Sequence, residues 1–208
     1  MDPVITPFMR WLINWLEVED PWEIVDIRVP HRRIAVGSMR TFSWYMEGES
    51  TVQISSVEEL LEWLERCEYE SDMSLFNETD FWQHPRTFER LQRGDCEDHA
   101  LWAWRKLLEI GMDASLVIGR YAGSANGHAC VLFHDNGAQL ILDPVVRDRD
   151  AVIRPLAEYR SHFEPWFTVS RSLEAQAREG YLLYMRDRLN RGESFLRAWR
   201  NRHATGYD

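Results

Sequence analysis

The chain has 208 residues, 45% of them hydrophobic, and carries a formal net charge of −10 at pH 7. This length and apolar content predict one well-packed domain, with or without a helical extension, and they exclude disorder as the main state. The acidic balance argues against a nucleic-acid partner and against an anionic membrane surface, although arginines gather near the end of the sequence. No run of about 18 uncharged apolar residues is present, so no transmembrane helix is expected.

The first segment, residues 2–22, predicts a helix that packs on the body of the protein and ends at Pro21. Its large apolar residues recur at helical spacing: Phe8, Trp11, Leu12, Trp15 and Leu16. An export signal is not expected, because Asp2 stands where a basic residue would be needed and Arg10 interrupts the apolar stretch.

The three cysteines, Cys67, Cys96 and Cys130, are too few and too irregularly spaced for a disulfide framework. An odd number of cysteines would also leave one of them unpaired. A reducing compartment fits best, and we expect a cytoplasmic protein.

Two strands are expected next, over residues 32–46 and 50–56, because apolar and polar residues alternate there. Residues 55–71 predict an amphipathic helix that begins with a serine cap followed by a glutamate three residues later. Its apolar side is formed by Leu60, Leu61, Trp63, Leu64 and Cys67. Cys67 is therefore expected in the core.

A second amphipathic helix is predicted from Asp95 to Gly111, with Ala100, Leu101, Trp104, Leu107 and Leu108 at helical spacing. Three strands are expected after it, over residues 114–121, 128–133 and 138–144. The sequence His-Asp-Asn-Gly joins the last two, and Asn-Gly between apolar runs is a strong hairpin signal. The tail, residues 170–203, predicts helix with a break near Gly192.

No internal repeat or long linker divides the chain, so these elements predict one compact α+β domain. We expect residues 1–57 to form an accessory helix and strands, residues 58–168 the core, and residues 169–208 a C-terminal helical extension.

Cys96 stands at the predicted start of its helix. Unpaired backbone N–H groups and the positive end of the helix dipole favour an anion there, which lowers the pKa of a thiol. Asp95, Glu97 and Asp98 surround the cysteine with negative charge, which raises the pKa of the thiol unless these carboxylates point away.

Hairpin geometry selects the histidine that could activate this cysteine. If residues 136–137 form a two-residue turn, counting outward along both strands sets Cys130 opposite Asp143. His128 shares the face of Cys130, so Asp143 is its diagonal neighbour and lies within reach of a hydrogen bond. A three-residue loop or a bulge would turn Asp143 to the opposite face.

Cys96, His128 and Asp143 are, in this order, the three parts of a cysteine hydrolase. The sequences GDCEDHA, GHACVLF and LILDP that contain them resemble the transglutaminase-like superfamily of the papain-like fold, especially the bacterial transglutaminase-like cysteine proteinases. Residues 81–98 also resemble the stretch that precedes the cysteine in those proteins. The resemblance covers roughly residues 81–144, under a third of the chain. It implies a catalytic helix whose N-terminal cysteine packs on an antiparallel sheet.

The resemblance also implies a role for each residue. Cys96 would be the nucleophile, His128 the general base and acid, and Asp143 the group that orients the imidazole. The Cys96 backbone N–H and a donor near Trp82 or Gln83 would hold the oxyanion. The reaction would pass through a thioester on a peptide or protein substrate, at a peptide or amide bond.

Some relatives in this bacterial group bind calcium through acids beside the cysteine, which here would be Asp95 and Glu97. Those relatives are exported, and this chain shows no export signal, so no cofactor is expected.

Two alternatives use the same region differently. Cys96, His99, His128 and Cys130 could converge on a tetrahedral zinc in a structural scaffold, although their spacing matches no known finger. Alternatively, a transglutaminase-like domain could keep its fold and serve only to bind a partner.

Overall fold

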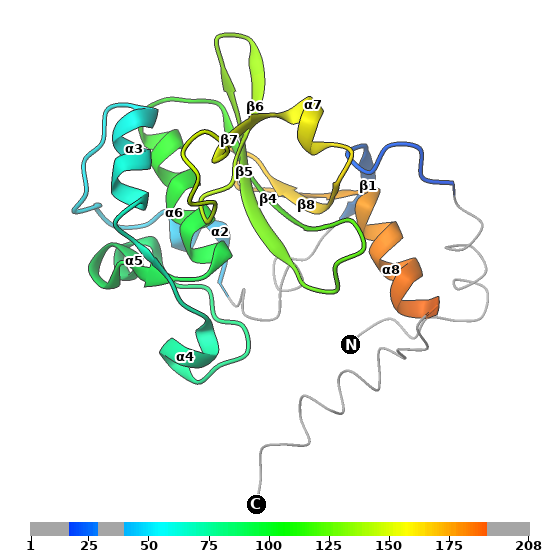
Figure 1. Ribbon diagram of the computed structural model, residues 1–208, viewed down its shortest axis with the longest axis horizontal. Helices are drawn as coiled ribbons and strands as arrows, with labels where there is room; N and C mark the ends of the chain where they lie inside the picture. Colours follow the sequence, from blue (N-terminus) through cyan, green and yellow to red (C-terminus); the bar gives the residue numbers. More distant parts are fainter. Residues whose placement is uncertain (1–16, 29–39, 191–208) are drawn as a thin grey trace, which may run out of the picture.

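The computed structural model describes residues 17–28 and 40–190, which form a central sheet with helices packed around it (Figure 1). The helices α3 (Val57–Leu64), α5 (Pro85–Leu91) and α6 (Cys96–Glu109) are grouped on one side of the sheet, and α8 (Gly180–Asn190) lies at the other end. The apolar positions of the predicted N-terminal helix, residues 8–16, and the predicted break near Gly192 lie outside the described residues.

Seven strands form one antiparallel sheet in the order β1-β9-β8-β4-β5-β6-β7, so β4 is the central strand. Their bounds are β1 Ile24–Arg28, β4 Ala114–Tyr121, β5 His128–Asp135, β6 Ala138–Leu142, β7 Ile153–Pro155, β8 Phe163–Val169 and β9 Ala175–Arg178. A separate parallel pair, β2 (Glu68–Tyr69) and β3 (Arg93–Gly94), lies just before α6 in the fold.

The remaining helices are short: α2 (Phe42–Tyr45), α4 (Asp72–Phe76) and α7 (Leu156–Tyr159). The predicted cap of α3 is confirmed, because Ser56 Oγ accepts from the Glu59 N–H at 3.2 Å and the Glu59 carboxylate accepts from the Ser55 N–H at 2.6 Å. Cys67 is buried in the core, as expected. No helix within residues 17–28 and 40–190 is long and apolar enough to cross a bilayer.

The helix α6 forms the centre of the main core, and its Trp104 side chain is fully buried. Alternate residues of β5 divide between the two faces of the sheet. Ala129 and Val131 belong to the main core with α6, whereas Cys130 packs with Phe163 in a smaller cluster. The expected α+β core, in which a helix that starts at a cysteine packs on an antiparallel sheet, is confirmed.

The predicted hairpin is also confirmed. Asn136 and Gly137 have φ values of 47° and 80°, and a type I′ turn requires positive φ at both positions. The two-residue turn pairs Asp135 with Ala138, and the same register continues to the pair of Val131 and Leu142. The hairpin therefore has the parity on which the position of Asp143 depends.

The prediction of strands over residues 32–46 and 50–56 is wrong for the part of these segments that the structure describes. Residues 42–45 form α2, and residues 50–56 form no strand. The backbone of the second segment binds buried charged side chains instead of a neighbouring strand: Lys106 Nζ donates to Val52 O at 2.6 Å, and Glu89 accepts from the Thr51 N–H at 2.9 Å.

The helix predicted over residues 170–203 begins only at Gly180, because residues 175–178 form β9. This strand pairs with β8 on one side and β1 on the other, so the sheet satisfies its backbone groups. Its buried Ala177 packs in the main core. The helix propensity of a short alanine-rich segment is overridden here by its place between two strands.

Candidate active site

Cys96 is the first residue of α6 and is half-buried. Its thiol donates a hydrogen bond to Glu97 Oε2 at 3.2 Å. The sulfur also contacts the backbone N–H of Ala129, the residue that follows His128 on β5. The packing of α6 on the sheet therefore places the cysteine beside the start of β5.

The pKa of the Cys96 thiol is raised well above its usual value, first by burial and then by the carboxylates of Glu97 and Asp95. The start of the helix and the Ala129 N–H act in the opposite direction and do not offset these effects. The acids beside the cysteine do not all point away, since Glu97 Oε2 accepts a hydrogen bond from the thiol. In this arrangement the sulfur is held as a thiol.

His128 opens β5, and Asp143 directly follows the last residue of β6. The His128 Nε2 and Asp143 Oδ2 atoms lie 2.9 Å apart, and both side chains are largely buried. This contact leaves His128 Nδ1 as the nitrogen that could exchange a proton with a thiol. The register of the hairpin thus forms the predicted histidine–aspartate pair.

Two tyrosines complete the surroundings of Asp143. The hydroxyl groups of Tyr121 and Tyr159 donate to Asp143 Oδ2 at 2.7 and 2.8 Å, so this oxygen also accepts from both phenols. The Tyr121 ring stacks on the His128 ring with centroids 5.3 Å apart. Burial and the neighbouring carboxylate raise the pKa of both phenols, which remain donors.

The sequence interpretation missed both tyrosines. Tyr121 ends β4 and lies two residues beyond Gly119, the partner of His128, so strand pairing could have indicated it. Tyr159 comes from α7, and no local pattern connects it with the hairpin.

The pKa of the Asp143 carboxyl is lowered. Burial alone would raise it, but the hydrogen bond and charge of His128 and the two phenol hydroxyls outweigh that effect. Asp143 is therefore an ionised acceptor suited to hold the imidazole in one orientation. Its Oδ1 atom is buried without a hydrogen-bond partner among the described residues.

The predicted oxyanion candidates, Trp82 and Gln83, are both buried just before α5. The Gln83 backbone N–H donates to Asp98 Oδ1 at 2.7 Å, and its side-chain amide donates to Asp98 and to Arg93 O. The Trp82 indole N–H donates to Asp80 Oδ1 at 3.1 Å. These donors therefore support Asp98 and the surrounding loop in this structure.

Three acids gather beside the cysteine. Asp72, from α4, Asp95 and Glu97 each offer an oxygen within 4.8 Å of the others. One oxygen of Asp72 and one of Asp95 are buried with no hydrogen-bond partner among the described residues. Burial, with nearby carboxylates contributing, raises the pKa of Asp72 to about 6. Asp95 and Glu97 were singled out from the sequence, whereas Asp72 comes from a distant helix that gave no signal.

The zinc alternative is wrong for the described residues. Asp72, Asp95 and Glu97 are the only group of three or more candidate ligands that they bring together. His99 is fully buried, and its Nδ1 lies 2.8 Å from Asp95 O. Cys130 is buried in the smaller cluster on the far face of the sheet from α6.

This arrangement, with a cysteine at the start of a helix packed on an antiparallel sheet that carries a histidine–aspartate pair, is typical of the transglutaminase-like superfamily and its papain-like fold. Residues 80–160 match the family model of the CEP76 peptidase-like domain, and this segment contains Cys96, His128 and Asp143. The match supports the resemblance seen in the sequence motifs and a peptidase-like core.

Solved structures of LapG from Legionella pneumophila are similar to this chain. The calcium-bound LapG structure has a TM-score of 0.47 and 18% sequence identity over 65% of this chain and 75% of LapG. Another LapG structure has a TM-score of 0.46 and 16% identity over 88% of this chain and 90% of LapG. No curated protein sequence matches this chain.

Proposed function

We propose that the protein is a cysteine hydrolase that cleaves peptide or amide bonds, with Cys96 as nucleophile, His128 as general base and acid, and Asp143 as the residue that orients His128. The observation that carries this proposal is the 2.9 Å contact between His128 Nε2 and Asp143 Oδ2, beside a backbone N–H that touches the Cys96 sulfur. A nucleophile, a base and an orienting carboxylate are the three roles that acyl transfer requires.

The reaction would proceed in two halves. His128 Nδ1 takes the thiol proton while the Cys96 sulfur attacks the carbonyl carbon. The carbon–nitrogen bond then breaks, and His128 returns the proton to the leaving amine, which leaves an acyl thioester on Cys96. In the second half, His128 removes a proton from water as the water oxygen attacks the carbonyl carbon of the thioester. The carbon–sulfur bond then breaks, the acyl group leaves as a carboxylic acid, and His128 returns the proton to the Cys96 sulfur.

The oxyanion needs two N–H donors at a point that the thiol can reach. The Cys96 backbone N–H lies in the first turn of α6, where the helix leaves such groups without an internal partner. We propose the main-chain N–H of Trp82 as the second donor, because the N–H groups of Gln83 are bound to Asp98 and Arg93.

We further propose that Asp72, Asp95 and Glu97 hold a divalent cation such as calcium. Carboxylate oxygens are the ligands that calcium prefers, and the two partnerless buried oxygens of Asp72 and Asp95 fit this role. A bound cation would supply positive charge beside the thiol and balance the carboxylates that raise its pKa. With Glu97 turned to that site, the Cys96 proton would be free to pass to His128.

The test is acylation of the native protein by p-nitrophenyl acetate, with the release of p-nitrophenol and the mass of the modified peptide both recorded. We expect an acetyl group on Cys96 and continued turnover. Cys96→Ala should abolish both, and His128→Ala should slow turnover about a thousandfold. Cys67→Ala is the matched control, because burial raises the pKa of this thiol to about 12 and it should not react.

The result that contradicts the proposal is a Cys96 that stays unmodified with and without added calcium. The catalytically silent binding module would then be the better account, since the raised pKa of the Cys96 thiol already favours an unreactive sulfur.

A further inference from the structure

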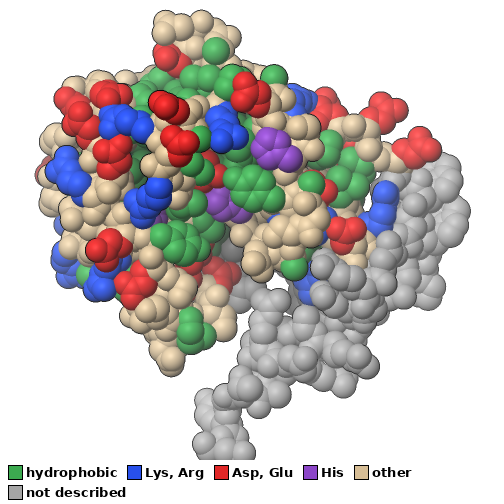
Figure 2. Space-filling model, viewed as in Figure 1, with side chains coloured by type: hydrophobic (Ala, Val, Ile, Leu, Met, Phe, Trp, Pro, Cys, Tyr) green, Lys and Arg blue, Asp and Glu red, His purple; other side chains and the backbone are tan. Residues whose placement is uncertain are grey.

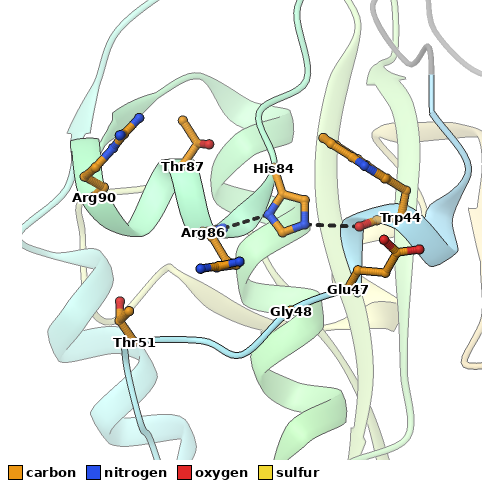
Figure 3. Close-up of a pocket in the computed structure, with 8 residues that line it drawn as sticks. All are labelled: Trp44, Glu47, Gly48, Thr51, His84, Arg86, Thr87 and Arg90. Carbon is orange, nitrogen blue, oxygen red and sulfur yellow. Dashed lines mark hydrogen bonds between the residues drawn. The ribbon is translucent and has the colours of Figure 1, made fainter.

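A second feature of the molecule is a groove of about 870 Å³ between α2, the loop that follows it and α5 (Figure 3). The proposed catalytic residues do not line this groove. Its principal lining residues are Trp44, Glu47, Thr51, His84, Arg86 and Arg90. In Figure 3 the two arginines and Thr51 occupy one half of the groove, and Trp44 and Glu47 occupy the other.

The floor of the groove is fixed by Arg105 of α6, which is buried. Its guanidinium donates to the backbone carbonyls of Tyr45 and Glu47, at 3.4 and 3.2 Å, and also to that of Gly48. A buried guanidinium that binds three carbonyls within four residues holds that segment in one conformation, because releasing the segment would break three hydrogen bonds to a buried charge. The α2 side of the groove is therefore preformed.

The next part of the same loop is held just as firmly. Lys106 Nζ donates to Val52 O at 2.6 Å, and Glu89 Oε2 accepts from the N–H and the hydroxyl of Thr51 at 2.9 and 3.0 Å. Lys106 and Glu89 are themselves 3.5 Å apart and buried. The groove consequently keeps its shape without a ligand, which lowers the entropic cost of binding one.

Arg86 and Arg90 are exposed and four residues apart on α5, so their side chains lie on the same face of the helix. Among the ion pairs formed within residues 17–28 and 40–190, none involves either arginine. Gly48 leaves room for Arg86, since a Cβ at that position would lie 2.8 Å from Arg86 Nη1. Two unneutralised guanidinium groups thus face one groove in a chain of net charge −10.

The other half of the groove contains the Trp44 ring, which the Arg40 guanidinium contacts at 5.3 Å from the ring centroid. The Trp44 ring packs edge-on against the His84 ring, with centroids 4.7 Å apart. Both nitrogens of His84 are engaged, Nε2 with Trp44 O and Nδ1 with the Arg86 N–H. Burial lowers the pKa of His84, with Arg105 and Arg86 contributing, so this ring stays neutral and acts as a support.

From this juxtaposition of Arg86, Arg90 and Trp44 we infer that the groove binds an acidic peptide segment. The carboxylates of the segment pair with the two guanidinium groups, and an apolar side chain further along packs against Trp44. Arginines one helical turn apart are separated by about 5–6 Å at their Cβ atoms, and alternate residues of an extended peptide by about 7 Å. The segment therefore carries acids at alternate positions. Glu47 repels a further acid at the Trp44 end and so sets the direction of binding.

The site does not require the catalytic chemistry, so its test is equilibrium binding to the full chain. The probe is a fluorescein-labelled peptide, Glu-Ser-Glu-Ser-Phe-Ser, followed by anisotropy at low ionic strength. The matched ligand is Gln-Ser-Gln-Ser-Phe-Ser. We expect binding of the acidic peptide, at least about tenfold weaker binding of the amide version, and the same result in Cys96→Ala.

Two sets of variants locate the site. Arg86→Glu combined with Arg90→Glu should weaken binding of the acidic peptide about tenfold or more, because attraction becomes repulsion. If the variant with two glutamates folds poorly, Arg86→Gln combined with Arg90→Gln replaces it, and this milder variant should also weaken binding of the acidic peptide. Arg66→Glu with Arg171→Glu makes the same change in net charge at exposed positions away from the groove and should leave binding nearly unchanged.

Three outcomes would overturn the inference: equal binding of the acidic and amide peptides, binding that survives both Arg86 and Arg90 pairs, or an equal loss in the Arg66 and Arg171 control. The last outcome would show that net charge alone attracts the peptide. Trp44→Ala should weaken binding of the phenylalanine-containing probe but not of a probe with serine at that position, and a loss in both would also count against the proposed arrangement.

Discussion

The His128 Nε2 and Asp143 Oδ2 atoms lie 2.9 Å apart, although the residues are separated by 15 positions in the sequence. The contact results from the type I′ turn at the tip of the hairpin, whose two residues set the parity of every pair between β5 and β6. The Tyr121 and Tyr159 hydroxyls then hold the same Asp143 oxygen. The register of the hairpin therefore brings His128 and Asp143 together, and hydroxyl groups from β4 and α7 hold the Asp143 carboxylate in position.

Asp143→Asn tests this relationship. The substitution keeps the shape of the side chain but removes the charge that favours one orientation of His128, so acylation of Cys96 should slow about a thousandfold with little change in fold. Single-turnover acylation by the reactive ester measures the effect. Asp113→Asn is the matched control, because Asp113 pairs with His134 at 3.1 Å on the exposed side of the hairpin. Equal rates in the wild type and Asp143→Asn would contradict the role assigned to Asp143.

Tyr159→Phe should move the acid limb of the pH profile to higher pH. The pKa of Asp143 is lowered in the native protein partly by the Tyr159 hydroxyl, so removing this donor raises the pKa and the carboxylate is protonated at higher pH. Tyr121→Phe should act in the same direction. If Tyr159 had a purely structural role, Tyr159→Phe would lower the yield of folded protein without displacing the pH profile. Tyr184→Phe, whose hydroxyl accepts from Arg188, is the control.

The parts that could be predicted from the sequence follow short-range rules. The periodicity of residues 95–111 fixed the helix that starts at Cys96, and Asn136-Gly137 set the register that brings Asp143 to His128. What could not be predicted depends on distant partners. Residues 50–56 alternate like a strand but bind Lys106 and Glu89, and β9 is a strand because two others flank it.

The site shows the same division. Asp95 and Glu97 stand next to Cys96 in the sequence, whereas Asp72 reaches them from α4 and Tyr159 reaches Asp143 from α7. The effect of the acids on the thiol also depended on the direction of their side chains, because a carboxylate beside Cys96 could turn outward or accept a hydrogen bond from the thiol. Glu97 accepts this hydrogen bond, and no local pattern specifies that rotamer.

Added calcium should raise the melting temperature of the protein, and a chelator should reverse the increase. A cation that binds only the folded state adds about 2.7 kcal/mol at a concentration one hundred times its Kd. Asp72→Asn should remove most of this response, because Asp72 supplies one of the three oxygens. Glu62→Gln, at an exposed position of α3, should leave the response unchanged. Melting curves that are identical with calcium and with chelator would contradict a cation site.

Glu89→Gln should destabilise the fold strongly. Glu89 is buried, lies 3.5 Å from Lys106 and accepts from Thr51 and Trp102. Removing the Glu89 charge leaves the buried Lys106 with the partly exposed Glu109 as its charged partner, so we expect a cost of about 3 kcal/mol, at the lower end for a broken buried pair. Glu109→Gln, whose carboxylate also pairs with Lys106 but is partly exposed, should cost about 1 kcal/mol or less. Urea unfolding measures both losses.

The ionised state of Glu89 beside Lys106 should also appear in the pH dependence of the free energy of unfolding. Burial would raise the pKa of Glu89, but hydrogen bonds from Ser50, Thr51 and Trp102 lower it overall. A carboxyl whose pKa is lower in the folded than in the unfolded state contributes stability that is present above the unfolded value of about 4.3 and is lost as the pH falls through the folded value. The free energy of unfolding of Glu89→Gln should therefore fall less than that of the wild type between about pH 6 and about pH 3. Parallel curves for the two proteins would mean that Glu89 is not the ionised partner of Lys106.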